Sequence, residues 1–206
     1  MAATKPTPVY LERGKTWVFA CTIEWPGWCR RGRGDEAALE ALRSYADRYA
    51  QVAGDGFRPG TLVVIGEVPG SVTTDFGAPD GRGPWDDDPL TKREADRQAG
   101  LLEAAWSRLD DVVATAPASL RKGPRGGGRD RDAVAEHVRE AERSYGRMIG
   151  VRVPPRTPWP EQHAEISAAI RSRTSEARWP LRYAVRRIAW HVLDHAWEIE
   201  DRSDPA

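Results

Sequence analysis

Two histidines with the spacing of a shared metal site lie in RYAVRRIAWHVLDHAWEIEDR, residues 182–202. His191 and His195 are four residues apart, so on a helix their imidazoles lie one above the other on the same face. Both fall within the apolar stripe of the predicted helix. Burying an imidazole without a partner costs free energy, because its ring nitrogens are polar. A bound metal ion would remove that cost.

A third histidine, His137, falls within the apolar stripe of another predicted helix. That stripe consists of Val134, Val138, Ala141, Tyr145 and Met148. We therefore take His137, His191 and His195 as the candidate metal ligands. Three protein ligands leave a coordination position open, as in catalytic zinc sites, whereas structural sites use four. Neutral nitrogen ligands suit zinc, nickel, iron or copper, and the spacing does not choose among these metals.

The same histidines also have a structural interpretation, in which each interior ring hydrogen-bonds to a carboxylate. Candidate acceptors are Glu136, Asp194 and Glu198. If a metal is present, Asp194 and Glu198 could instead orient its ligands. Glu198 is the better placed of the two because it follows His195 by three residues.

Three other polar residues near these helices have two interpretations each. Arg186 and Arg187 either bind an anionic substrate or form surface ion pairs. His163, near the start of a predicted third helix, is expected to be a surface residue or to lie just behind the ligands.

The composition limits the class of protein. The chain has 206 residues, 40% of them apolar, which suffices for one domain or two small ones. Lys+Arg and Asp+Glu both total 31, and this balance argues against nucleic acid as the main partner. The N-terminus lacks the apolar region of a signal peptide, and no stretch is long and apolar enough for a membrane span. Cys21 and Cys29 are too few for a disulfide framework. We expect a cytoplasmic protein that binds neither membrane nor nucleic acid.

Residues 1–70 are predicted to form a small α+β unit. In KTWVFACTIEWPGW, apolar residues alternate with smaller or more polar ones, which predicts a strand, and WCRRGRG predicts a short second one. EAALEALRSYADRYAQVA reads as one helix with Asp35 as its N-cap. TLVVIGEV, at 61–68, predicts a further strand.

Residues 91–206 are predicted to form a bundle of four helices. The first begins at a capping box made by Thr91 and Glu94. The others are expected at about 132–149, 160–173 and 180–201. Between the two halves, residues 71–90 are rich in Pro, Gly and Asp and are predicted to be a linker. The Gly/Arg-rich segment 121–131 is predicted to be a solvated loop, because it has no phosphate-binding motif.

The helical half resembles the DinB-like (YfiT-like) superfamily of four-helix-bundle metalloproteins, over about residues 90–202. The resemblance rests on the helix order and on the segments DAVAEHVREAERSY and RRIAWHVLDHAWEIEDR. In that family one His lies on the second helix and an HxxxH pair on the last, matching His137, His191 and His195. The resemblance implies an open site for a divalent metal, zinc or nickel before iron. Characterised members include mycothiol- or bacillithiol-dependent S-transferases and maleylpyruvate isomerase.

The first half resembles the HicB-like antitoxins over about residues 15–68. The segment FACTIEWPGWCRRGRGDEAALEALRSYADRY follows their pattern of strand, Pro-Gly, short strand and a helix opened by Glu-Ala. This resemblance implies a protein partner. The alternative is a small α+β unit that only accompanies the bundle.

We therefore predict an α+β protein in which a HicB-like unit precedes a DinB-like bundle. The predicted function is metal-dependent chemistry on a small molecule, either thiol S-transfer or hydrolysis. A divalent ion lowers the pKa of a bound thiol or water, so a metal-bound thiolate or hydroxide would be the nucleophile. Thiol transfer would need a low-molecular-weight thiol as co-substrate. The alternative is a non-catalytic binding or regulatory protein, with a structural metal or none, that acts through a protein partner or as a homodimer.

Overall fold

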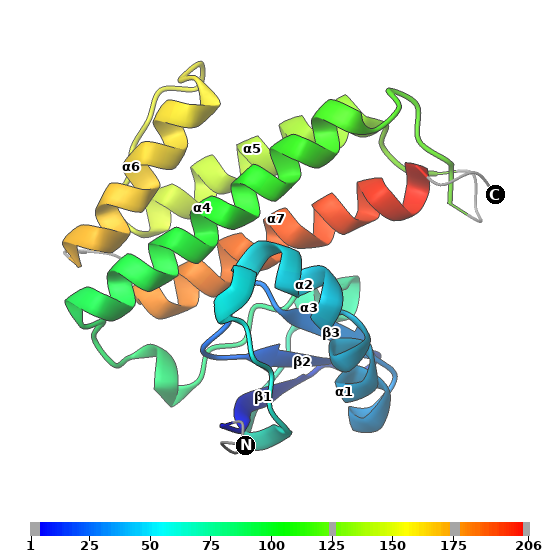
Figure 1. The fold of residues 1–206 in the computed structure, drawn as a ribbon, viewed down its shortest axis with the longest axis vertical. Coiled ribbons are helices and arrows are strands. Elements are labelled where there is room, and N and C mark those ends of the chain that lie inside the picture. The colour runs from blue at the N-terminus through cyan, green and yellow to red at the C-terminus, as the bar shows by residue number, and fades with distance from the viewer. Residues whose placement is uncertain (1–4, 124–126, 174–177, 204–206) are drawn as a thin grey trace. The chain divides into compact units, whose positions relative to one another are not determined.

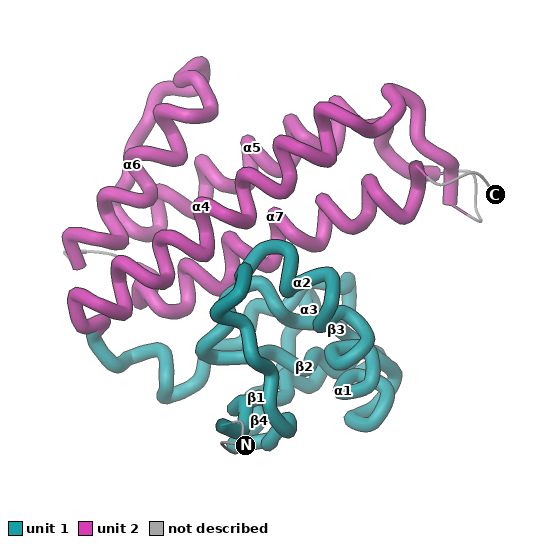
Figure 2. Tube along the Cα trace, in the orientation of Figure 1, with its two compact units in different colours: residues 1–89 teal, residues 90–206 magenta. Residues whose placement is uncertain are grey.

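The computed structural model describes residues 5–123, 127–173 and 178–203 and has the predicted α+β architecture (Figure 1). The chain divides into two compact units, Met1–Pro89 and Leu90–Ala206 (Figure 2). The first unit contains a four-stranded sheet and the second is helical. No helix of the described residues combines the length and apolarity needed to cross a membrane.

The sheet of the first unit has the strand order β3-β2-β1-β4. Its strands are β1 Thr7–Arg13, β2 Val18–Thr22, β3 Cys29–Gly32 and β4 Leu62–Pro69. The three strands β1, β2 and β3 pair antiparallel, whereas β4 runs parallel to β1 at one edge. The sequence predicted β2, β3 and β4 but missed β1, which occupies a central position with neighbours on both sides.

The helix predicted after β3 is divided in two, α1 Asp35–Ser44 and α2 Ala46–Ala53. Tyr45 interrupts it with φ −95° and ψ 4°, and the guanidinium groups of Arg30 and Arg48 lie over its ring. Asp35 is not the N-cap, because its carboxylate pairs with Arg13 of β1 at 2.7 Å and Gly34 occupies the cap position.

The segment predicted to be a linker instead packs within the first unit as far as residue 89. It contains the short helix α3 Val72–Phe76. Glu12 of β1 is fully buried and accepts hydrogen bonds from the Thr74 hydroxyl at 2.6 Å and from the amides of Asp80 and Gly81 at 2.9 Å. Burial raises the pKa of Glu12. A Cβ at Gly81 would lie within 3.0 Å of the Glu12 side chain, so this glycine allows the close approach.

The second unit contains the four predicted long helices, α4 Lys92–Thr115, α5 Arg131–Met148, α6 Trp159–Ser172 and α7 Leu181–Ser203. The capping box is present: the Thr91 hydroxyl accepts from the Glu94 amide and Glu94 accepts from the Thr91 amide at 2.8 Å. Figure 1 shows α4 and α7 side by side, and α7 also packs against α5. Because α7 has neighbours on both sides, more than half of its residues are buried.

Candidate metal centre

The structure brings the three predicted ligands together. His137 lies on α5, and His191 and His195 lie on α7. One ligand atom from each ring lies within 4.8 Å of the other two, so the cluster could hold a metal ion. The three ring centroids are 4.7–5.1 Å apart. Each imidazole therefore faces the same small volume between the two helices.

The closest pair of nitrogens in the cluster is at a distance suited to a shared ion. Nε2 of His137 is 3.3 Å from Nε2 of His191. Two nitrogens that each lie about 2.05 Å from a tetrahedral zinc ion are about 3.3 Å apart. A hydrogen bond between the two rings is also compatible with this distance, provided that one of the nitrogens is protonated.

His191 distinguishes the metal interpretation from the structural one. Its side chain is buried, at 6% exposure, and its Nδ1 has no hydrogen-bond partner among the described residues. Its Nε2 meets another imidazole rather than a carboxylate or a carbonyl. Buried polar groups in proteins are normally satisfied, so an interior histidine without an oxygen acceptor needs an explanation. The donor set of the cluster, three imidazoles with accessible lone pairs, fits a divalent transition metal.

The pKa values of two of these rings favour the neutral form that binds metals. Burial, assisted by the charges of His195 and Arg187, places the pKa of His191 well below its ordinary value. Burial and the charge of His195 also lower the pKa of His137. Both shifts favour the neutral ring, which offers a lone pair without first losing a proton.

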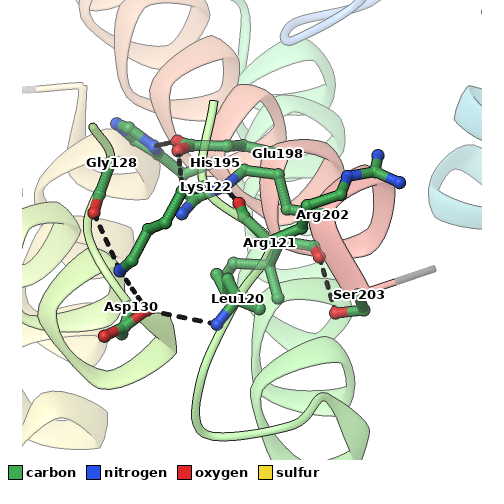
Figure 3. A network of polar contacts seen from close by, with 10 residues as sticks. Leu120, Arg121, Lys122, Gly128, Asp130, His195, Glu198, Arg202 and Ser203 are labelled. Atoms are coloured by element: carbon green, nitrogen blue, oxygen red, sulfur yellow. Dashed lines mark hydrogen bonds and ion pairs between the residues drawn. The ribbon is translucent and has the colours of Figure 1, made fainter. Parts of the chain in front are cut away.

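The carboxylate of Glu198 orients the third ring. Its Oε2 lies 2.7 Å from Nδ1 of His195, and its Oε1 accepts from Arg202 at 2.6 Å (Figure 3). The hydrogen bond from His195 lowers the pKa of Glu198, so the carboxylate is ionised at neutral pH. A proton held on Nδ1 leaves Nε2 of His195 free for a metal. Asp194, the other predicted acceptor, precedes His195 and points about 100° away around the helix.

The Gly/Arg-rich segment predicted to be a solvated loop is attached to the end of α7 behind this carboxylate. Arg121 and Arg202 exchange hydrogen bonds: the Arg121 amide donates to the Arg202 carbonyl and the Arg202 guanidinium donates back to the Arg121 carbonyl (Figure 3). Lys122 binds Asp130 within the same segment. Arg202 thus connects the loop to Glu198. The contact between Glu198 and Arg202 could have been predicted from the sequence, because the two residues are four positions apart on one helix.

The two predicted substrate-binding arginines lie one helical turn before the ligands. Arg186 is buried, at 7% exposure, rather than at the surface. Arg187 is half-buried, and its guanidinium lies over the rings of Tyr145, at 5.2 Å, and Trp190, at 4.9 Å. Sequence reasoning did not assign Tyr145 to the site, although its ring also lies edge-on to His191 at 5.7 Å.

His163 belongs to a different cluster, and the prediction of a surface position is wrong. Its ring stacks on Trp106 at 3.9 Å, and its Nε2 lies 3.1 Å from Oε2 of Glu142. Glu142 is fully buried and also accepts hydrogen bonds from the indoles of Trp106 and Trp159. This network joins α4, α5 and α6. The fourth histidine therefore has the oxygen acceptor that His191 lacks.

Comparison with known proteins gives no match: no family model, curated protein or solved structure matches the chain.

Proposed function

We propose that the helical unit is a metal-dependent enzyme that acts on a small molecule. The carrying observation is the convergence of His137, His191 and His195, in which the buried ring of His191 has no oxygen acceptor among the described residues. The three side chains would hold a divalent transition metal, with zinc or nickel ahead of iron. Such an ion supplies positive charge that lowers the pKa of a thiol or water near it.

The chain's own residues have defined tasks in this proposal. Burial keeps His191 neutral, and the hydrogen bond to Glu198 holds the proton of His195 on Nδ1. The hydrogen bonds from His195 and, to a smaller extent, Arg202 lower the pKa of Glu198, and Arg202 also holds its carboxylate in place. Because three ring nitrogens converge among the described residues, a four-coordinate ion would have room for one reacting group.

Thiol transfer is the reaction class that we place first, and hydrolysis the second. The preference rests on the resemblance of residues 90–202 to the DinB-like superfamily, whose characterised members include thiol-dependent S-transferases. A low-molecular-weight thiol would then be the co-substrate. Turnover of an electrophile that requires added thiol supports transfer, whereas turnover in water alone favours hydrolysis.

The first test is metal content by mass spectrometry, on protein prepared without chelator or polyhistidine tag. We expect about one transition-metal ion per chain in the wild type and a large loss in His191→Ala. The matched control is His163→Gln, which removes the histidine that belongs to the Glu142 cluster. That variant should retain the ion if it folds, as checked by circular dichroism.

A wild type that stays free of metal after incubation with zinc, nickel and iron would contradict this proposal. The non-catalytic alternative would then gain weight, since one observation favours it independently. The first unit exposes five large hydrophobic side chains at 43–85%, a feature of protein-binding surfaces: Val63, Val64, Ile65, Val72 and Phe76. Equal metal loss in the His191 and His163 variants would also contradict the ligand assignment.

A further inference from the structure

A cationic group, the guanidinium of Arg187, lies near the histidine cluster and forms no ion pair with an acidic side chain among the described residues. Arg187 precedes His191 by four residues on α7, so both side chains project from the same helix face. The two side chains also share two aromatic neighbours. The Tyr145 ring is 5.2 Å from the Arg187 guanidinium carbon and 5.7 Å from the His191 ring, and Trp190 lies 4.9 Å and 6.0 Å from them. The guanidinium is also close enough to the His191 ring for its charge to lower the pKa of that ring.

The guanidinium of Arg187 is held in place by two aromatic rings, but one of its N–H groups lacks a hydrogen-bond acceptor among the described residues. Tyr145 and Trp190 both lie at cation–π distance from it, which limits its motion. Its Nη1 is buried and has no hydrogen-bond partner among the residues that the structure describes. A buried charged donor without an acceptor costs free energy, so its retention beside a candidate metal site points to an absent ligand.

Other charged residues around the three histidines add to the local excess of positive charge. Arg129, an exposed residue, is close enough to lower the pKa of both His137 and His191. Of the two acidic groups that influence His137, Glu198 is already bound to His195 and Arg202, and Glu140 lies on α5. A divalent ion on three neutral imidazoles would make the site more positive still. The surroundings thus favour an anion.

We propose that Arg187, assisted by Arg129, binds the carboxylate of a small anionic ligand whose reacting group lies at the three histidines. We expect the anionic group to be a carboxylate, because a planar guanidinium binds a carboxylate through two parallel hydrogen bonds. This inference rests on the proposed function, since it defines the substrate or co-substrate class of the same site. It predicts selection against ligands of the same size that are neutral or cationic.

The test uses full-length protein loaded with cobalt(II) and three thiols of similar size: 3-mercaptopropionate, 2-mercaptoethanol and cysteamine. Thiolate binding is followed by the sulfur-to-cobalt charge-transfer absorption. In the wild type we expect the anionic thiol to bind about tenfold or more tighter than the neutral one, and the cationic thiol to bind weakest. Arg187→Gln should abolish the preference for the anion, because it should weaken 3-mercaptopropionate binding about tenfold more than it weakens 2-mercaptoethanol binding.

Two further variants separate this role from general electrostatics and from misfolding. Arg187→Lys keeps the charge but loses the planar fork, so it should retain only part of the preference. Arg147→Gln makes the same charge change at an exposed position on α5, about 15 Å along the helix from His137. It should bind all three thiols as the wild type does. An equal loss of anion preference in the Arg147 and Arg187 variants would overturn the proposal.

A second experiment, on protein without metal, distinguishes failure of the anion-site proposal from failure of the proposed metal-dependent function. Malonate should raise the thermal midpoint of the apo wild type and have no effect on Arg187→Gln. If cobalt does not bind but malonate acts through Arg187, the anion site stands and the metal proposal fails. If cobalt and all three thiols bind with equal affinity, or malonate acts equally on both proteins, the anion site is refuted.

Discussion

The contrast between the buried His191 and the half-buried His163 defines the site at the scale of the residue. His163 has a carboxylate acceptor in Glu142, whereas His191 meets only another imidazole. Both positions carry the same residue type within amphipathic helices, so sequence pattern alone does not separate them. The hydrogen-bond acceptor separates the two histidines. An imidazole that is hydrogen-bonded to a carboxylate has a structural role, whereas a buried imidazole without an oxygen acceptor is a candidate metal ligand.

Replacing Glu198 by Gln should weaken metal binding without removing a ligand. The amide cannot stabilise the proton on Nδ1 of His195 as a carboxylate does, so we expect an affinity loss of about tenfold. The measurement is a competition titration against a chromophoric chelator. Glu136→Gln is the control, because this mostly exposed glutamate lies next to His137 in the sequence. Unchanged affinity in the Glu198 variant would show that this carboxylate supports only the fold.

The candidate ligands could be predicted from the sequence because His191 and His195 are related by local helix geometry. The charged residues that surround these histidines could not be predicted from the sequence. Arg129 comes from a loop, and its influence on His137 and His191 depends on how that loop attaches to α7. Tyr145 was assigned to the core stripe of α5, where its second contact with Arg187 has no sequence signature.

At the scale of the element, the first turn of α4 is held by its cap and by α7. Glu94 completes the capping box with Thr91 and also pairs with Arg182 in the first turn of α7, at 2.8 Å. The hydrogen bond from Arg182, followed by those from Thr91, lowers the pKa of Glu94 to about 2. The carboxylate therefore links two helix beginnings that lie 88 positions apart in the chain.

This carboxylate predicts a specific acid sensitivity. A lowered folded-state pKa contributes stability that is present above the unfolded value of about 4.5 and is lost as the pH falls toward 2. Glu94→Gln should therefore be less stable than the wild type at pH 7 and similar to it near pH 2. Urea denaturation at several pH values measures the difference. Glu165→Gln, an exposed change on α6, serves as the control. A difference from the wild type that does not vary with pH would refute the linkage.

The elements that sequence reasoning missed owe their structure to distant contacts. The strand β1 reads TPVYLER, in which a proline and a glutamate conceal a buried strand. Glu12 is tolerated there only because Thr74, Asp80 and Gly81 supply its hydrogen bonds. The same contacts convert the predicted linker into part of the first unit. The amphipathic helices of the second unit, in contrast, carry their period of 3.6 in every turn, and their bounds were predicted to within a few residues.

At the scale of the whole molecule, all three candidate ligands lie in the unit Leu90–Ala206. Each unit has its own buried core, so we expect calorimetry to resolve two unfolding transitions. Metal at a hundredfold excess over its dissociation constant should stabilise only one of them, by about 2.7 kcal/mol. The shift should be absent in His191→Ala. A single transition that moves as a whole would show that the units unfold together.

His137 and His191 are 54 positions apart in the chain, and this separation determines when the histidine cluster can form during protein synthesis. The sheet of the first unit is complete once β4 has emerged from the ribosome beside β1. A nascent chain that has reached only α5 carries one of the three imidazoles and cannot chelate an ion. If the cluster binds a metal as proposed, the ion can be acquired only after α7 has been translated.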